Sequence, residues 1–199
     1  MLDKIANQTS DDPKRHAVLE GAMAVFLAYG YQRATMEDIA RSAEMSRPAL
    51  YLLFRNKADI YRALAEGVFE KCYNLIDERL AHNDPLAVRL GSAIESVVCG
   101  VMADIENTPH GRELIDLKAS LAADLIGDWM NRISARYAVA IQNDADARGV
   151  DLSARGLTAI GVANTMICAI DGAKHRFHST DEQRQVILDT VRVVELAMA

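Results

Sequence analysis

The stretch TMEDIARSAEMSRPALYLLFRNK, residues 35–57, decides the fold because it holds two short helical patterns separated by a tight turn. Thr35 can cap the first helix, and Asp38 is placed to reach back to it as in a capping box. Ser46 can cap the second helix, and Pro48 falls in its first turn, where a missing amide breaks no intrahelical hydrogen bond. Small and apolar residues between the caps allow two helices to cross steeply. The stretch therefore predicts a helix-turn-helix.

Glu44 is the unusual residue of this stretch because it occupies the turn between the two helices. Such a turn often takes a left-handed backbone conformation, which suits glycine. A glutamate in that conformation costs about 1 kcal/mol, which a packed turn tolerates. The sequence leaves the backbone conformation of Glu44 open.

The rest of the chain also reads at helical period, and no stretch combines strict alternation with β-branched and aromatic residues. Gly30 supplies a stop for the first helix and Asn56 an N-cap for the fourth. The sequence thus predicts an all-α fold of about nine helices that follows a polar, aperiodic tail. The expected helices cover 13–29, 35–42, 47–54, 56–81, 86–105, 111–122, 123–146, 153–177 and 181–198.

Composition favours a cytoplasmic protein. The 199 residues include three cysteines, Cys72, Cys99 and Cys168, which lie far apart and form no CxxC pair. This usage is typical of a reducing compartment. We expect no exported leader and no membrane span, because no stretch approaches about 18 unbroken apolar residues.

Charge is distributed unevenly along the chain. The net charge is −6, yet the segment from Lys14 to Arg62 carries eight Lys and Arg against five Asp and Glu. A basic segment joined to an acidic remainder indicates that a polyanion meets one end of the molecule only.

The segment FLAYGYQRATMEDIARSAEMSRPALYLLFRNKADIYRAL, residues 26–64, resembles the DNA-binding region of the TetR family of transcriptional regulators. The resemblance runs from about Val18 to Leu64, and it rests on the YGY and AT elements, the IA pair, Ser46, the LY pair, Phe54 and the NK pair. It implies an N-terminal three-helix DNA-binding domain over 13–58. It also implies a larger helical-bundle domain for effector binding and dimerisation over 59–199.

The resemblance assigns DNA contacts residue by residue. Arg47 can reach guanine O6 and N7 in the major groove, while Tyr51 offers its hydroxyl to a phosphate. Thr35 and Lys57 stand at helix N-termini, which favour phosphate. Many relatives carry a polar residue at the position of Leu53, so one phosphate contact is expected to be absent. The expected DNA-binding residues are Arg33, Thr35, Ser46, Arg47, Pro48, Ala49, Tyr51, Leu52, Arg55 and Lys57.

The function implied by the resemblance is a ligand-responsive homodimeric repressor of a palindromic operator. The dimer is expected to form through the last two long helices, about 153–177 and 181–198. Alternatives are an effector-independent or activating regulator, or a helical dimer with an interaction or enzymatic role. No catalytic motif such as GxSxG or HExxH is present, so we expect no enzyme.

An effector pocket is also implied by the resemblance, and its small-molecule ligand is unidentified. No metal or other cofactor is expected. Asn164, Cys168, Asp171 and His175 share one helix face, where a metal site, a thiol switch and hydrogen bonds at a seam or pocket wall all remain open. The expected ligand-binding residues are Cys99, Met102, Trp129, Met130, Tyr137, Asn164, Cys168 and Asp171.

Overall fold

The computed structural model describes residues 12–177 and 179–199, with the backbone alone at His175 and Thr180. The described chain is helical throughout and contains no strand, which confirms the predicted all-α class. Two compact units divide it. The head unit comprises the chain up to Cys72 together with Met102–Asp128, and the body unit comprises Tyr73–Val101 and Trp129–Ala199.

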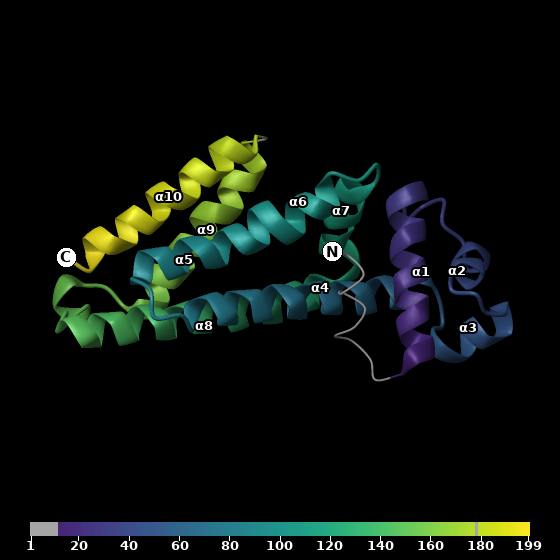
Figure 1. The fold of residues 1–199 in the computed structure, drawn as a ribbon, viewed down its shortest axis with the longest axis horizontal. Helices are drawn as coiled ribbons and strands as arrows, with labels where there is room; N and C mark the ends of the chain where they lie inside the picture. Colours follow the sequence, from purple (N-terminus) through teal and green to yellow (C-terminus); the bar gives the residue numbers. More distant parts are fainter. Residues whose placement is uncertain (1–11, 178) are drawn as a thin grey trace. The chain divides into compact units, whose positions relative to one another are not determined.

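The head unit is built on three N-terminal helices. They are α1 (Pro13–Tyr29), α2 (Met36–Ser42) and α3 (Arg47–Leu53), and α2 contacts both of the others (Figure 1). The start of α4 (Lys57–Leu80), α6 (Ala103–Glu106), α7 (Gly111–Leu121) and the first turn of α8 (Ala123–Arg148) complete the unit. Its core side chains, each with no exposed surface, include Leu19, Phe26, Ile39, Leu50 and Ile60.

Side-chain caps begin these helices where the sequence predicts them. Thr35 and Asp38 form both halves of a capping box at α2, and Ser46 caps α3 through the amide of Ala49. The Asn56 side chain accepts from the first amides of α4. Each such cap is worth about 1 kcal/mol, so local chemistry fixes the register of α2, α3 and α4.

The body unit contains the rest of α4 and α8 together with α5 (Leu86–Glu95), α9 (Ala159–Arg176) and α10 (Thr180–Ala197). Helix α10 packs along both α9 and α5 (Figure 1). Helix α5 continues without a break through η3 (Ser96–Met102) into α6, so the described chain has nine separate helices if this run counts as one and short 3₁₀ turns are left out. The predicted boundary between a DNA-binding domain and a regulatory domain, near residue 58, remains a prediction. The two compact units are a different division of the chain, and they separate after Cys72, within α4.

The helix predicted for 86–105 is confirmed as Leu86–Glu106, but its middle is not an α-helix. Residues Ser96–Met102 form a π-helix, in which hydrogen bonds span five residues instead of four. Because the wider turn changes which side chains share a face, the 3.6-residue period misassigns the residues that follow it.

The helix predicted for 153–177 begins six residues later than expected. Ser153–Arg155 form only a 3₁₀ turn, which ends at Gly156 with φ of +70° in the left-handed region. Thr158 then caps α9 by accepting from the amide of Gly161 at 3.1 Å. The prediction was wrong here because Ser153 is also a good capping residue, and only the chain fold selects between the two caps.

One helix of the described chain, Leu86–Glu106, is long and apolar enough to cross a membrane by length and composition. Its Arg89 donates to the Leu80 carbonyl at 3.1 Å and lies 3.7 Å from Asp144. Leu90 and Ala93 have no exposed surface within the unit. These apolar residues therefore face packed protein, as they do in the core helix of a folded domain.

Candidate DNA-binding surface

Helix α3 turns one face into the head unit and the other into solvent. Leu50 is fully buried, whereas Tyr51 is 44% exposed and Leu52 is 88% exposed. Arg47, on the first turn, exposes 58% of its side chain. Arg47, Tyr51 and Leu52 thus present a cation together with apolar surface on the exposed face of α3.

The turn between α2 and α3 is left-handed at Glu44. Glu44 has φ of +53°, and it is the one described non-glycine residue with positive φ. The amide of Ala43 donates to Ile39 O at 2.9 Å, and the amide of Met45 donates to Ala40 O at 3.0 Å. These bonds satisfy the end of α2 and aim α3 away from it, as in a left-handed helix C-cap.

Gly21 of α1 is a determinant of this turn that the sequence reading missed. A Cβ atom at Gly21 would lie 2.9 Å from the Ala43 amide nitrogen and 3.0 Å from the Ser42 carbonyl carbon. No side chain fits there, so glycine lets the α2–α3 turn pack directly against α1. The partners are more than 20 residues apart, so no local pattern announces this contact.

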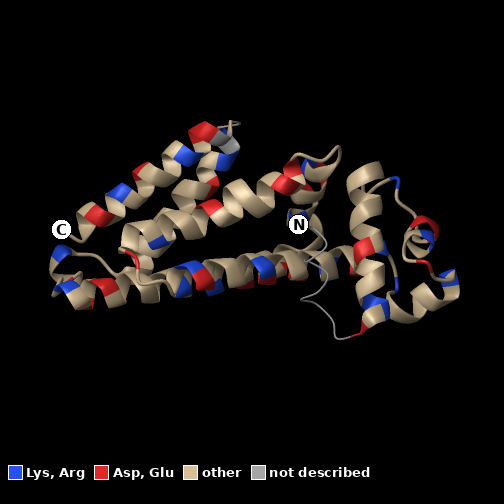
Figure 2. Ribbon diagram, in the orientation of Figure 1, with Lys and Arg blue, Asp and Glu red and all other residues tan. Residues whose placement is uncertain are grey.

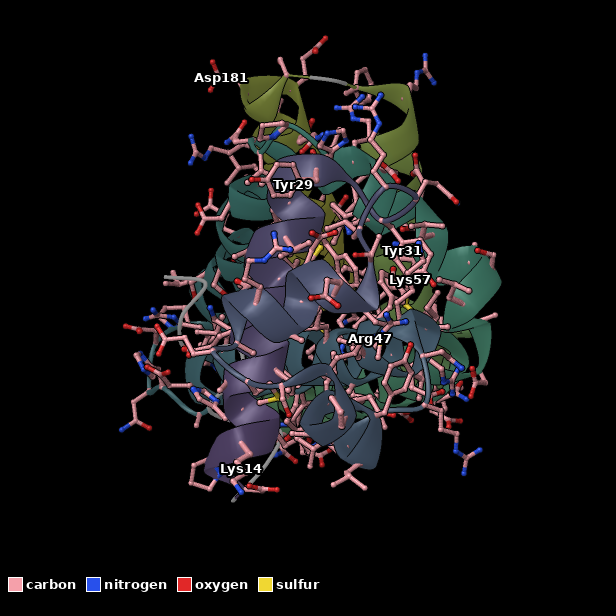
Figure 3. All side chains as sticks on the ribbon, turned by 90° about the vertical axis from the view of Figure 1, so that its right-hand side faces the viewer. Lys14, Tyr29, Tyr31, Arg47, Lys57 and Asp181 are labelled. Atoms are coloured by element: carbon pink, nitrogen blue, oxygen red, sulfur yellow. The ribbon has the colours of Figure 1, made fainter. Side chains whose placement is uncertain are left out.

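Arg47 already has protein partners on the α3 surface. Its guanidinium lies 5.6 Å from the centre of the Tyr51 ring and 3.9 Å from the Glu37 carboxylate. A hydrogen bond that the Arg47 guanidinium donates to Tyr51, with a smaller contribution from the Glu37 charge, raises the pKa of Arg47 above its ordinary value. Arg47 is therefore charged and held near the start of α3, which is the position expected for a residue that reads bases (Figure 3).

Lys57 forms more hydrogen bonds within the protein than its position in the sequence indicates. Its ammonium donates to the carbonyl oxygens of Tyr31, Gln32 and Ala34 at 2.7, 3.2 and 3.2 Å. It also lies 4.5 Å from the centre of the Tyr31 ring, and Figure 3 labels the two residues together. Three acceptors match the three N–H donors of a lysine. Lys57 thus fastens the loop between α1 and α2 to the start of α4.

The other predicted DNA contacts fall on the exposed surface of the head unit. Arg33, Thr35, Ser46, Pro48 and Arg55 are exposed, and Ala49 is half-buried. The hydroxyls of Thr35 and Ser46 serve as helix caps in this state. In Figure 2, blue Lys and Arg positions are interspersed with acidic ones along α1 and α2, whereas α3 carries Arg47 and no acidic residue.

Arg15 joins this surface from the start of α1, although the sequence reading did not select it. Its guanidinium stacks 4.3 Å from the centre of the Phe54 ring. With Tyr51 and Arg55 it borders an open hollow of about 470 Å³ past the end of α3. Arg15 and Arg55 are 40 positions apart, so only the fold brings the two cations to one hollow.

The body unit holds a separate, mainly apolar cavity. Four of the residues predicted to bind ligand line it: Trp129, Met130, Tyr137 and Asp171. The other four predicted residues, Cys99, Met102, Asn164 and Cys168, are not among its lining residues. Cys99 and Met102 lie in the π-helical turn, where the 3.6-residue period misassigns faces, and Asn164 and Cys168 are exposed.

The three described side chains of the polar stripe on α9 have different surroundings. Asn164 accepts a short hydrogen bond from Ser134, Cys168 is exposed, and Asp171 borders the cavity. The side chain of His175 lies outside the described residues. Among the described side chains no cluster of three or more His, Cys, Asp and Glu residues could hold a metal ion. Burial raises the pKa of the Cys99 thiol, which opposes formation of a reactive thiolate there.

Comparison with known proteins places the helix-turn-helix in a described family. Residues 18–64 match the bacterial regulatory proteins of the tetR family. The transcriptional repressor ComR of Escherichia coli K12 is 28% identical over 63% of this chain and 59% of its own length. The transcriptional activator FasR of Mycolicibacterium smegmatis is 30% identical over 45% of this chain and 41% of its own length. The matched region thus spans less than two thirds of these relatives.

The likeness of fold extends further than the likeness of sequence. The fatty acid degradation regulator FadR of Bacillus halodurans superposes with a TM-score of 0.67 at 14% identity. The match covers 93% of this chain and 96% of that protein. The helices outside residues 18–64 therefore follow a known fold, although most of their residues differ from those of that protein.

Proposed function

Because the chain belongs to the TetR family of bacterial transcriptional regulators, we propose that it is a homodimeric repressor that binds a palindromic operator and releases it on binding a small molecule. The family consists of transcriptional regulators and not of enzymes. The observation that carries the proposal is the exposed face of α3, where Arg47 stands on the first turn and Leu52 is 88% exposed.

Sequence readout follows from the chemistry of that face. The planar guanidinium of Arg47 can donate two hydrogen bonds to the O6 and N7 acceptors of guanine. Leu52 and the half-buried Ala49 offer apolar contact to thymine methyl groups. On binding, Arg47 exchanges the Glu37 carboxylate for the base edge. Arg33 and Arg55, both exposed, supply phosphate contacts that fix the register.

The dimer of the proposal forms through α9 and α10. Four large apolar side chains of these helices are exposed, namely Ile160, Leu188, Val193 and Leu196, at 44–65%. A shallow apolar groove runs between the two helices. Burying such a face against its own copy gives a two-fold dimer, and two-fold symmetry matches a palindromic operator with half-sites about one helical turn apart.

In this proposal the effector binds in the cavity of the body unit and thereby releases DNA. A ligand there releases DNA if it binds the released state more tightly than the DNA-bound state. Such a regulator acts in the cytoplasm, where bacterial DNA lies.

Selection of binding sequences from random duplex DNA tests the proposal. We expect an enriched palindrome for the full chain. Arg47→Ala should relax the preference at one base pair of each half-site, since one bidentate contact is worth about 1–3 kcal/mol of discrimination. Lys118→Ala, on α7, is the control for loss of a cation and should select the unchanged palindrome. Recovery of sequences without any consensus would refute the proposal.

A further inference from the structure

The cavity of the body unit is lined by side chains from α4, α5, the π-helical turn, α8 and α9. Its deep wall is aliphatic and closely packed. Ile76, Ile94, Val97, Val98 and Ile133 all line it and are at most 7% exposed. An ionised group pushed against this wall would lose its hydration without gaining a partner, which costs several kcal/mol. The inner part of any ligand must therefore be uncharged and apolar.

The residues of α9 that line the cavity change from apolar to charged toward the C-terminal end of the helix. Ile167 and Ile170 line its middle, and Asp171 and Lys174 line it toward the C-terminal end of the helix. Both charged residues are half-buried. The Asp171 carboxylate forms no hydrogen bond or ion pair with the side chains that the structure describes. A hydrogen-bond acceptor and an ammonium thus stand one turn apart at one end of an apolar space.

This inference rests on the proposed effector response. We propose that the effector is a compact alcohol or phenol, with its hydrocarbon body in the cavity and its hydroxyl between Asp171 and Lys174. A hydroxyl both donates and accepts, so it can donate to the carboxylate and accept from the ammonium. A carboxylate would attract Lys174 but face the like charge of Asp171, and an amine would attract Asp171 but face the like charge of Lys174; either ion would also lose hydration against the aliphatic wall. A neutral hydroxyl can bond to both residues without the cost of burying a third charge.

The free space limits the ligand to a small body. The cavity encloses about 50 Å³ of space open to the centre of a water-sized sphere. At about 12 Å³ for each water, this holds roughly four waters, the volume of one aromatic ring with a substituent. Trp129 and Tyr137 add aromatic surface for such a ring. Fused rings and long chains would have to move the walls.

The π-helical turn adds a second indication that this space is a binding site. Val97 and Val98 line the cavity from within Ser96–Met102. π-Helical turns are rare, cost hydrogen-bond geometry and occur frequently at functional sites. The extra residue in this turn widens the helix where it faces the cavity.

The chain carries its own probe, because Trp129 is the single tryptophan of the sequence and lines the cavity. Titration of the full-length protein, followed by tryptophan fluorescence, can use four compounds of matched size: 4-methylphenol, toluene, 4-methylbenzoate and 4-methylbenzylamine. We expect 4-methylphenol to bind most tightly, toluene less tightly, and both charged compounds at least tenfold more weakly than 4-methylphenol.

Variants locate the site and assign the polar contact. Asp171→Asn should weaken 4-methylphenol about tenfold and leave toluene within twofold, because only the phenol donates to the carboxylate. Val98→Phe should fill the cavity and abolish binding of both. Val88→Phe is its control, since Val88 lies in the same helical run but is 53% exposed, and it should bind as the wild type does.

Each alternative result has a defined meaning. Tighter binding of the benzoate or the amine would overturn the hydroxyl assignment, and unchanged binding to Val98→Phe would overturn the location. If none of the four compounds binds while the protein still selects a palindrome, the effector class is wrong and the proposed function stands. If no palindrome is selected, the proposed function fails, and the fluorescence titration still decides whether the cavity takes a phenol.

Discussion

Lys57 is the residue whose role changes most between sequence and structure. Its position at the start of α4 is typical of a phosphate contact, yet its ammonium already donates to three backbone carbonyls of residues 31–34. The loop that it holds leads directly into Thr35 and α2. In the proposed regulator, Lys57 would therefore act on DNA binding through the placement of α2.

Salt dependence separates these two roles. A lost phosphate contact lowers the slope of log affinity against log salt by about 0.9, whereas a lost positioning contact does not. We expect Lys57→Met to lower both the melting temperature and the DNA affinity at constant slope. Arg33→Met, at an exposed site, should lower the slope with an unchanged melting temperature. A reduced slope with full stability in Lys57→Met would assign that lysine to phosphate.

The backbone strain at Glu44 should lower the stability of the fold by a measurable amount. A non-glycine residue at φ of +53° is strained by about 1 kcal/mol relative to glycine. We expect Glu44→Gly to raise the free energy of unfolding by about 0.5–1 kcal/mol, after allowance for the greater entropy that glycine loses on folding. Urea denaturation measures the change, and Glu66→Gly in the middle of α4 should instead destabilise by about 1 kcal/mol. A destabilised Glu44→Gly would mean that the glutamate side chain contributes more than its backbone costs.

Between helices, an ion pair joins α4 to the start of α8 within the head unit. The Arg62 guanidinium donates to both Asp124 oxygens at 2.8 and 2.6 Å and also to the Leu121 carbonyl. These hydrogen bonds lower the pKa of Asp124 to about 2. Because the folded-state pKa lies below the unfolded one, this contribution is complete above about pH 5 and is lost as the pH falls from about 4 to 2.

A pH series of unfolding experiments tests this pair. Asp124→Asn should be less stable than the wild type at pH 7, and the difference should shrink to nothing as the pH approaches 2. Asp116→Asn, at an exposed aspartate of α7, should differ little from the wild type at any pH. A difference between wild type and Asp124→Asn that is constant with pH would show that the charge of Asp124 is not involved.

The helices themselves could be predicted wherever the chain carries local signals. Thr35, Ser46 and Asn56 announce the starts of α2, α3 and α4 because capping is a short-range interaction. The π-helical turn could not be predicted, since no periodicity distinguishes it from an α-helix of equal apolar content. Ser153 was mistaken for a helix start because it competes with Thr158, and tertiary packing decides between them.

The candidate sites were predictable to different degrees for the same reason. The DNA-binding face lies within one continuous motif, so Arg47, Tyr51 and Leu52 could be selected from sequence alone. Gly21 and Arg15 act across distances of more than 20 residues and carry no local signal. The cavity draws residues from five segments, and bulky side chains such as Trp129 were found while its isoleucines and valines were not.

For the molecule as a whole, the proposed function requires a dimer, which we propose forms through α9 and α10. We expect Val193→Glu to give a monomer, because it places a charge in an apolar interface at a valine that is 65% exposed in one chain. Light scattering after size-exclusion chromatography measures the mass. Val139→Glu, at a 52% exposed valine of α8, should remain a dimer. A dimeric Val193→Glu would exclude this face.

The binding of the selected palindrome by the purified chain is the most direct test of a dimeric operator-binding regulator. Fluorescence anisotropy across a salt series gives affinity, stoichiometry and slope together. We predict two chains on each palindrome, a linear fall of log affinity with log salt, and binding at least 1,000-fold tighter than to a scrambled duplex at the same salt. Equal affinity for the palindrome and the scrambled duplex would contradict it.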